Sequence, residues 1–181
     1  MISLLRGVNV GGHNRIKMDS LRKLYASLDL LDARTYVQSG NVIFRTEDPD
    51  LGHATRRIED GIERSFGFRP RVVARTVSEL RDVVARNPFA GRQDIEPSRL
   101  LVIFLASEPV AAVRQKVREI PADLEEMRIE GREIYIYFPN GMARPKLSPA
   151  LIEKTLKIPG TGRNWNSVTK LLEIAEELEA S

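Results

Sequence analysis

The stretch Leu100-Leu101-Val102-Ile103-Phe104-Leu105 is apolar at every position. A short run of this kind is typical of a strand buried on both faces, because a strand with one face in water alternates apolar and polar residues. The segment before it, RNPFAGRQDIEPS at 86–98, holds two prolines and a glycine, as connectors do. We therefore expect residues 100–106 to open a second half. Helices should cover one face of this strand, and the other half or the C-terminal helix the other face.

The predicted order of elements is the same on both sides of this connector. Each half reads strand, helix, strand, tight turn, strand and helix, and the first half adds a closing strand. The sequence thus predicts an α+β fold, a tandem of two ferredoxin-like (split β-α-β) units plus a C-terminal helix. The first half is expected at 1–85, the connector at 86–98, and the second half with the C-terminal helix at 99–181. Elements are expected at 2–5, 19–28, 34–38, 42–45, 51–66, 71–74 and 78–85, then at 100–106, 109–118, 127–130, 133–138, 148–157 and 166–179.

Composition excludes several classes of function. The 181 residues include no cysteine, so the chain has no disulfide, no thiolate zinc site and no cysteine nucleophile. The longest apolar run, Leu100–Ala106, is much shorter than the roughly 20 residues that cross a bilayer. Neither HxxxH nor HExxH spacing occurs, so we expect no metal and no cofactor. A cytoplasmic protein fits these features.

Basic residues gather in two stretches from which acids are nearly absent. Residues 1–18 contain no acid, and residues 134–172 contain only Glu153, although the net charge of the chain is only +3. If the two stretches meet in space, their combined field attracts an anion. The alternative is that these lysines and arginines are solvated on helix faces.

Three polar, glycine-containing motifs are candidate binding sites. The first is a loop at 5–17 (LRGVNVGGHNRIK), in which glycines allow close approach of the backbone to a ligand and successive N–H groups form an anion nest. The second is the turn QSGN at 38–41, and the third is the segment PGTGRNWNSVTK at 159–170, which leads into a helix. The candidate ligand-binding residues are Arg6, Asn9, Gly11, Gly12, Lys17, Gln38, Asn41, Arg163, Asn164 and Trp165.

Each motif also has a purely structural interpretation. The first is then a loop with glycines for tight turns, and Gly40 serves a hairpin turn. In the third motif, Asn164 or Asn166 caps the last helix. In the binding interpretation of the same motif, Arg163 binds a phosphate or carboxylate through two hydrogen bonds. Trp165 either stacks on a ring or fills the core.

The same three stretches resemble a bacterial family, domain of unknown function 1697. The residues that carry the likeness are LLRGVNVGGHNRIKM at 4–18, TYVQSGNVIF at 35–44 and TGRNWNSVTKLLEIA at 161–175, and the resemblance extends over nearly the whole chain. Gly162 departs from the family pattern, in which alanine is common there. Membership implies a tandem of ferredoxin-like α+β units, and it implies no activity and no catalytic residue.

The sequence leaves four functions open. The favoured one is a binding module for a small anionic or nucleotide-like ligand, held at a cleft between the halves. The second is an enzyme acting on a phosphorylated or nucleotide-like substrate, for which His13 is the only histidine in the motifs and no catalytic residue is assigned. The third is RNA binding, with Tyr135 and Tyr137 as a stacking pair, although these rings could instead pack internally. In the fourth, the motifs only hold the halves together.

Overall fold

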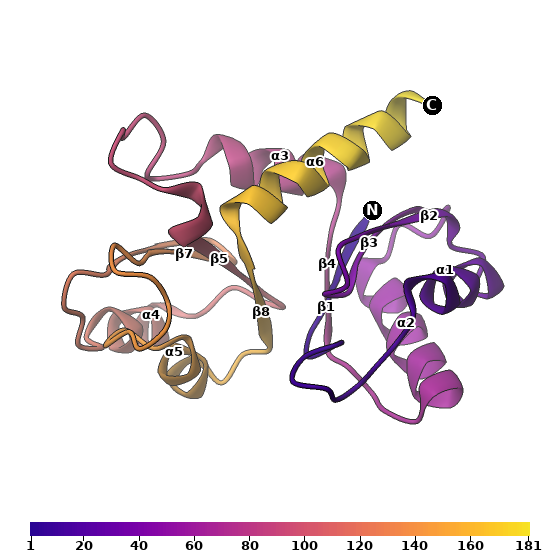
Figure 1. Ribbon diagram of the computed structural model, residues 1–181, viewed down its shortest axis with the longest axis horizontal. Helices are drawn as coiled ribbons and strands as arrows, with labels where there is room; N and C mark the ends of the chain where they lie inside the picture. The colour runs from indigo at the N-terminus through magenta and orange to yellow at the C-terminus, as the bar shows by residue number, and fades with distance from the viewer. The chain divides into compact units, whose positions relative to one another are not determined.

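The computed structural model describes residues 1–181 and has an α+β fold with two four-stranded antiparallel sheets and six α-helices (Figure 1). In chain order the elements are β1 (Ile2–Leu5), α1 (Met18–Ser27), β2 (Leu31–Tyr36), β3 (Asn41–Arg45), α2 (Leu51–Phe66), β4 (Val72–Arg75), α3 (Val77–Ala85), the 3-10 helix η1 (Pro97–Arg99), β5 (Leu100–Leu105), α4 (Ala111–Arg118), β6 (Glu126–Glu130), β7 (Glu133–Tyr137), α5 (Pro149–Leu156), β8 (Gly160–Asn164) and α6 (Trp165–Ala180). The chain divides into two compact units. The first unit comprises Met1–Arg81 and Lys170–Ser181, and the second comprises Asp82–Thr169.

In the first unit the strand order is β2-β3-β1-β4. Helices α1 and α2 pack side by side against one face of this sheet (Figure 1). Their apolar stripes meet the side chains that β1 and β3 direct to that face, because alternate strand residues share a face. The buried cluster there is Leu5, Val8, Ile16, Leu21, Leu24, Tyr25, Leu30, Val42, Phe44, Ile58, Ile62 and Val72.

The second unit repeats the arrangement with strand order β6-β7-β5-β8. Helices α4 and α5 lie together on one face of the sheet (Figure 1). The buried cluster on that face is Ile103, Leu105, Val117, Ile129, Ile134, Ile136, Phe138, Leu147, Ile152 and Leu156. On the other face Val102 and Phe104 are also fully buried, so the expectation that both faces of β5 are covered is confirmed.

Strand β8 corrects the sequence interpretation, which expected no strand between the elements at 148–157 and 166–179 and gave a closing strand to the first half alone. β8 pairs along its whole length with β5, from Leu105 opposite Gly160 to Leu101 opposite Asn164. A Cβ atom on Gly160 would lie 3.0 Å from Leu105 Cδ2, and one on Gly162 would lie 3.1 Å from Leu101 Cδ1. These glycines therefore let the leucines of β5 pack closely over the edge strand.

Residues 86–98 pack against the sheet of the second unit. The Arg92 guanidinium donates to both carboxylate oxygens of Glu126 on β6, at 2.8 and 2.9 Å. The Phe89 ring lies 6.3 Å from the ring of Tyr137, whose hydroxyl donates to the Asp94 carbonyl oxygen at 2.8 Å. Residues 86–98 therefore cover part of the sheet, although most of them belong to no strand or helix.

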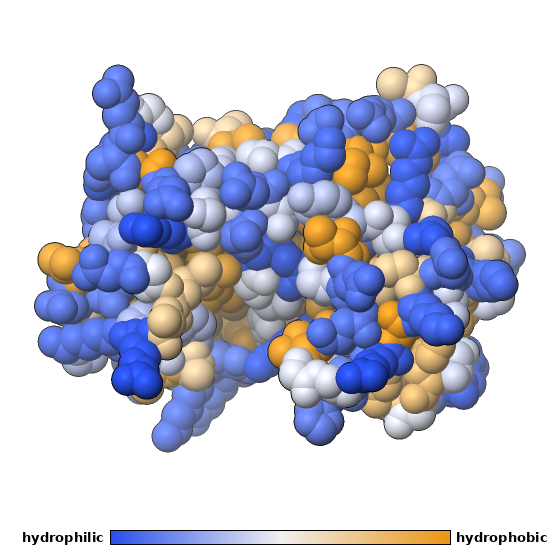
Figure 2. All heavy atoms as spheres, in the orientation of Figure 1, coloured by the Kyte–Doolittle hydropathy of each residue, from blue (hydrophilic) through white to orange (hydrophobic).

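None of the helices is both long enough and apolar enough to cross a membrane. On the face in Figure 2, hydrophobic side chains are scattered among hydrophilic ones. Exposed apolar residues such as Val10, Val37 and Val110 are single residues in loops or near helix ends.

Tyr25 makes the stability of the first unit depend on pH. Burial in the core raises the pKa of its phenol well above the ordinary value, although the hydrogen bond with Ser3 Oγ (2.7 Å) acts in the opposite direction. The unfolded chain loses this proton near pH 10, while the folded chain keeps it. The folded state then binds more protons than the unfolded state, so the stability that is intact below about pH 10 falls as the pH rises further.

We expect the Tyr25→Phe variant to lose part of this alkaline dependence. It should be less stable than the parent near pH 8, by about 1 kcal/mol, because the bond with Ser3 is lost. Urea unfolding between pH 8 and pH 11.5 should show a shallower decline for the variant. Burial also raises the pKa of Tyr135, so some decline should persist in the variant. Equal slopes for parent and variant would contradict the assignment.

Candidate functional site

Residues 7–17 of the first motif form a small hairpin. Gly11 and Gly12 both have positive φ, at +58° and +81°, as the two central residues of a type I′ turn require. Val10 and His13 pair across the turn, and the His13 N–H donates to the Val10 carbonyl oxygen at 3.0 Å. The two glycines therefore shape an exposed turn. Anion nests alternate right- and left-handed residues, whereas these two are both left-handed.

Asn9 joins this loop to the β2–β3 hairpin. Its backbone is left-handed (φ +56°), a conformation that asparagine tolerates better than most residues. Its side-chain Nδ2 donates to the carbonyl oxygens of Ile16 (3.0 Å) and Gln38 (2.8 Å), and its Oδ1 accepts the Ile16 N–H (2.9 Å). One carboxamide thus binds two segments that are 29 residues apart in the sequence.

The β2–β3 hairpin, residues 36–41, is the second wall of the site. Gly40 has φ +75°, and its carbonyl oxygen accepts the Leu5 N–H at 2.9 Å, which confirms its predicted role in the turn. Asn41 is fully buried, and its Nδ2 donates to the Tyr36 carbonyl oxygen and to Ser39 Oγ. Val37 is exposed and left-handed (φ +50°), which is unfavourable for a β-branched residue by roughly 1–2 kcal/mol.

A hollow of about 750 Å³ opens where the loop, the hairpin and the start of α1 come together. Its lining residues are Asn9, Gly12, Arg15, Ile16, Lys17, Met18, Asp19 and Gln38. The structure therefore brings four of the predicted residues to one place: Asn9, Gly12, Lys17 and Gln38. Arg15, Ile16, Met18 and Asp19 were not among the predicted residues, although Arg15 belongs to the acid-free stretch.

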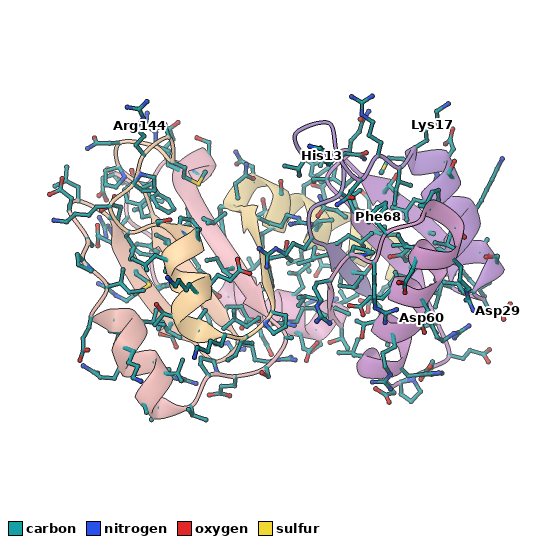
Figure 3. The ribbon with its side chains drawn as sticks, turned by 90° about the horizontal axis from the view of Figure 1, so that it is seen from below. His13, Lys17, Asp29, Asp60, Phe68 and Arg144 are labelled. Atoms are coloured by element: carbon teal, nitrogen blue, oxygen red, sulfur yellow. The ribbon has the colours of Figure 1, made fainter.

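The charges around the hollow are mainly positive. Arg15 and Lys17 are exposed and form no salt bridge, whereas Asp19 is paired with Arg22. Figure 3 shows the Lys17 side chain pointing away from the body of the unit. Lys17 also occupies the N-cap position of α1, where no side chain caps the helix. The positive end of the helix dipole therefore adds to the two side-chain charges.

Three other predicted residues of the first unit lie outside the lining of the hollow. Arg6 is exposed, and its backbone N–H donates to the Arg71 carbonyl oxygen at 2.9 Å. Gly11 is in the exposed turn, and Asn41 lies beneath the hairpin. His13 is exposed on the same turn and is not part of the lining either.

The third motif belongs to the second unit, where β8 leads directly into α6. Arg163 lies within β8 and is 9% exposed. Its Nη1 donates to Thr161 Oγ1 and to the Gly162 carbonyl oxygen, each at 2.8 Å, and burial lowers the pKa of its guanidinium to about 10. Asn164 Oδ1 accepts the Ser167 N–H at 2.9 Å, so of the two caps that the sequence left open, Asn164 and Asn166, the structure has Asn164. Trp165 is half-buried in the first turn of α6.

Comparison with known proteins identifies the family. The model of the family described as "Protein of unknown function (DUF1697)" matches residues 1–135. The chain belongs to this family. The matched part of this DUF1697 chain includes the first two motifs and ends before the third, although the sequence resemblance extended to residue 175. No curated protein matches the chain.

A solved structure shares the fold of this DUF1697 chain. It is described as that of the conserved bacterial protein SP0830 from Streptococcus pneumoniae, and it superimposes with a TM-score of 0.71 at 22% sequence identity. The alignment covers 96% of this chain and 97% of that chain. At this level of identity the likeness extends to the fold alone.

The structure contains no group of three or more His, Asp or Glu residues placed to hold a metal ion. His53, the second histidine, is paired with Asp48 at the start of α2 and is exposed.

Proposed function

We propose that the first unit binds a small anionic, nucleotide-like ligand in the hollow between the loop 7–17 and the β2–β3 hairpin. The observation that carries the proposal is that Arg15 and Lys17, both without a salt bridge, line the same hollow as Gln38. Two cations without acidic partners attract an anion, and arginine binds the oxygens of a phosphate or carboxylate through two parallel hydrogen bonds.

The size and the lining of the hollow favour a ligand larger than a bare ion. Pockets for small molecules usually have volumes of roughly 300–1,000 Å³, and the hollow falls within that range at about 750 Å³. Ile16 and Met18 add apolar surface beside the charges. A ligand with an anionic group and a ring or another apolar part suits this combination.

The observations favour this function over RNA binding. The RNA alternative depended on Tyr135 and Tyr137 as an exposed stacking pair. Both rings are buried, and their hydroxyl groups donate to the carbonyl oxygens of Val83 and Asp94. For the enzyme alternative, the only histidine in the motifs, His13, lies at an exposed turn outside the lining of the hollow.

We also propose that each unit is ferredoxin-like. Both units have the element order β-α-β-β-α-β. In both sheets the third strand lies between the first and the second, and the fourth strand pairs with the first. All of these pairs are antiparallel. This order of strands supports a split β-α-β topology in each unit.

We expect Arg15→Ala and Lys17→Ala each to weaken anion binding about tenfold, because each removes one charge-assisted hydrogen bond. Calorimetry and thermal-shift assays with inorganic phosphate, adenosine monophosphate and glucose 6-phosphate measure the effect. Lys23→Ala is the matched control, since Lys23 is an exposed cation on α1 outside the lining of the hollow. The control should leave the affinity unchanged. Absence of binding by the parent protein at millimolar concentrations of all three compounds would refute the proposal.

A further inference from the structure

We infer that Asn9 is a positioning residue: its carboxamide fixes the loop 7–17 against the β2–β3 hairpin and so sets the spacing between the two walls of the hollow. The inference deepens the proposed function and rests on it for its ligand. It also replaces the sequence-based expectation that Asn9 contacts the ligand directly.

Both hydrogen-bond donors of the Asn9 side chain are already used within the protein. An asparagine side chain has two N–H donors and one carbonyl oxygen with two lone pairs. Two bonds from Nδ2, to the carbonyl oxygens of Ile16 and Gln38, use both donors. An anion needs donors, so it would gain a bond from this side chain only if one of the two walls were released.

The two segments that Asn9 joins carry different parts of the lining. On one side, Ile16 stands between Arg15 and Lys17 in the sequence, so the position of its backbone determines where the side chains of both cations leave the chain. On the other side, the bond ends on the backbone carbonyl oxygen of Gln38, whose side chain lines the opposite wall. A shift of either segment therefore changes the distance between the cations and the hairpin. Sites of this kind lose affinity when their supporting contacts are loosened, even though the binding groups themselves are intact.

The backbone at Asn9 is adapted to this role. Its left-handed conformation turns the chain so that one side chain reaches both segments. The hairpin wall contains a further left-handed residue, Val37, directly before Gln38. Unfavourable conformations on a surface loop persist only where surrounding contacts hold them, and the bond from Asn9 to Gln38 is such a contact.

Asn14 is a natural control within the same loop. It is also left-handed (φ +51°), and its Nδ2 donates to the Gly7 carbonyl oxygen at 3.1 Å. That bond stays inside the loop and does not reach the hairpin. Glycine tolerates the left-handed backbone and adds no charge. Asn9→Gly loses the bond to the hairpin and the two bonds with Ile16, whereas Asn14→Gly loses only a bond within the loop.

The test compares these two variants with the parent protein by NMR, at a temperature at which all three are folded. Titration with inorganic phosphate is expected to show about tenfold weaker binding for Asn9→Gly, and affinity within about twofold of the parent for Asn14→Gly. Parental affinity in Asn9→Gly, or equal losses in both variants, would overturn the inference.

Amide hydrogen exchange without ligand separates this inference from the proposed function. The Ile16 amide and the amides of residues 38–41 should exchange faster in Asn9→Gly and at the parental rate in Asn14→Gly, because only Asn9 joins the two segments. If the parent protein binds no phosphate but these rates change as expected, the positioning role of Asn9 is supported and the ligand proposal fails. If the rates in Asn9→Gly are those of the parent, the positioning role of Asn9 is refuted.

Discussion

Replacement of Gly40 by alanine is expected to lower the free energy of unfolding by about 3 kcal/mol. Two costs add at this position. Gly40 has φ +75°, and a left-handed backbone costs a residue with a side chain roughly 1–2 kcal/mol. The new Cβ would also lie 2.7 Å from Leu5 Cβ and 3.4 Å from Val8 Cβ, and overpacking of a rigid core costs roughly another 1–3 kcal/mol.

Urea unfolding followed by circular dichroism measures this loss, with Gly67→Ala as the control. Gly67 ends α2 with φ +78°, and no atom lies within 4 Å of the position that its Cβ would take. In the control only the backbone conformation becomes unfavourable, so we expect its free energy of unfolding to fall by about 1–2 kcal/mol. Equal losses in the two variants would show that the contact with Leu5 is not limiting.

The regular elements of the fold could be predicted because their residues carry strong local patterns. The run Leu100–Leu105 is apolar throughout, and the structure buries both of its faces. The helix α2 follows from the spacing of Ile58, Ile62 and Phe66, and its predicted end at Gly67 is confirmed by a left-handed C-cap. In these places local preference and tertiary packing favour the same structure.

β8 could not be predicted because its residues have little strand propensity. Gly160, Gly162 and Asn164 belong to types that are depleted in strands, so the segment has the pattern of a loop. It is a strand because β5 offers it an edge, along which all five of its residues pair. The absence of a Cβ at the two glycines then allows the leucines of β5 to pack over it. These causes lie in residues about 60 positions earlier in the sequence, since Leu101 pairs with Asn164.

The sequence indicated some of the residues that line the hollow, but not the roles of these residues. The sequence placed the loop 5–17, the turn at 38–41 and the segment 159–170 at one site. Asn9 and Gln38 meet within the first unit and line the hollow, whereas Arg163, Asn164 and Trp165 belong to the second unit and are not part of its lining. The glycines of the loop were expected to expose N–H groups to an anion, but their φ values place them in a tight turn. Composition indicates that a loop is polar, whereas the backbone conformation decides which of its polar groups are already used.

Glu59 is the residue whose importance the sequence conceals most. It stands next to Ile58 in α2, where a charged residue is expected on the solvent side, yet it is 7% exposed. Its Oε1 accepts the Val72 N–H at 3.0 Å, and its Oε2 accepts a bond from Arg69 Nη2 at 3.2 Å. Val72 is the first residue of β4 and pairs with Leu5, at the point where β1 leads into the loop 7–17.

We expect Glu59→Leu to destabilise the protein by about 3 kcal/mol, because it leaves the buried Val72 N–H without an acceptor and Arg69 without its least exposed partner. Glu59→Gln should lose only about 1 kcal/mol, since the amide oxygen still accepts the Val72 N–H. Chemical denaturation of both variants measures the difference.

Glu63→Leu separates the two contributions. Glu63 accepts a bond from Nη1 of the same arginine at 2.9 Å, but it is exposed and forms no hydrogen bond with β4. Exposed ion pairs contribute roughly 0–1 kcal/mol, so this variant should stay within about 0.5 kcal/mol of the parent. A loss as large as that of Glu59→Leu would assign the stabilisation to Arg69. The expected contrast instead assigns it to the backbone of β4, where a buried carboxylate replaces a strand as the hydrogen-bond partner at the outer edge of the sheet.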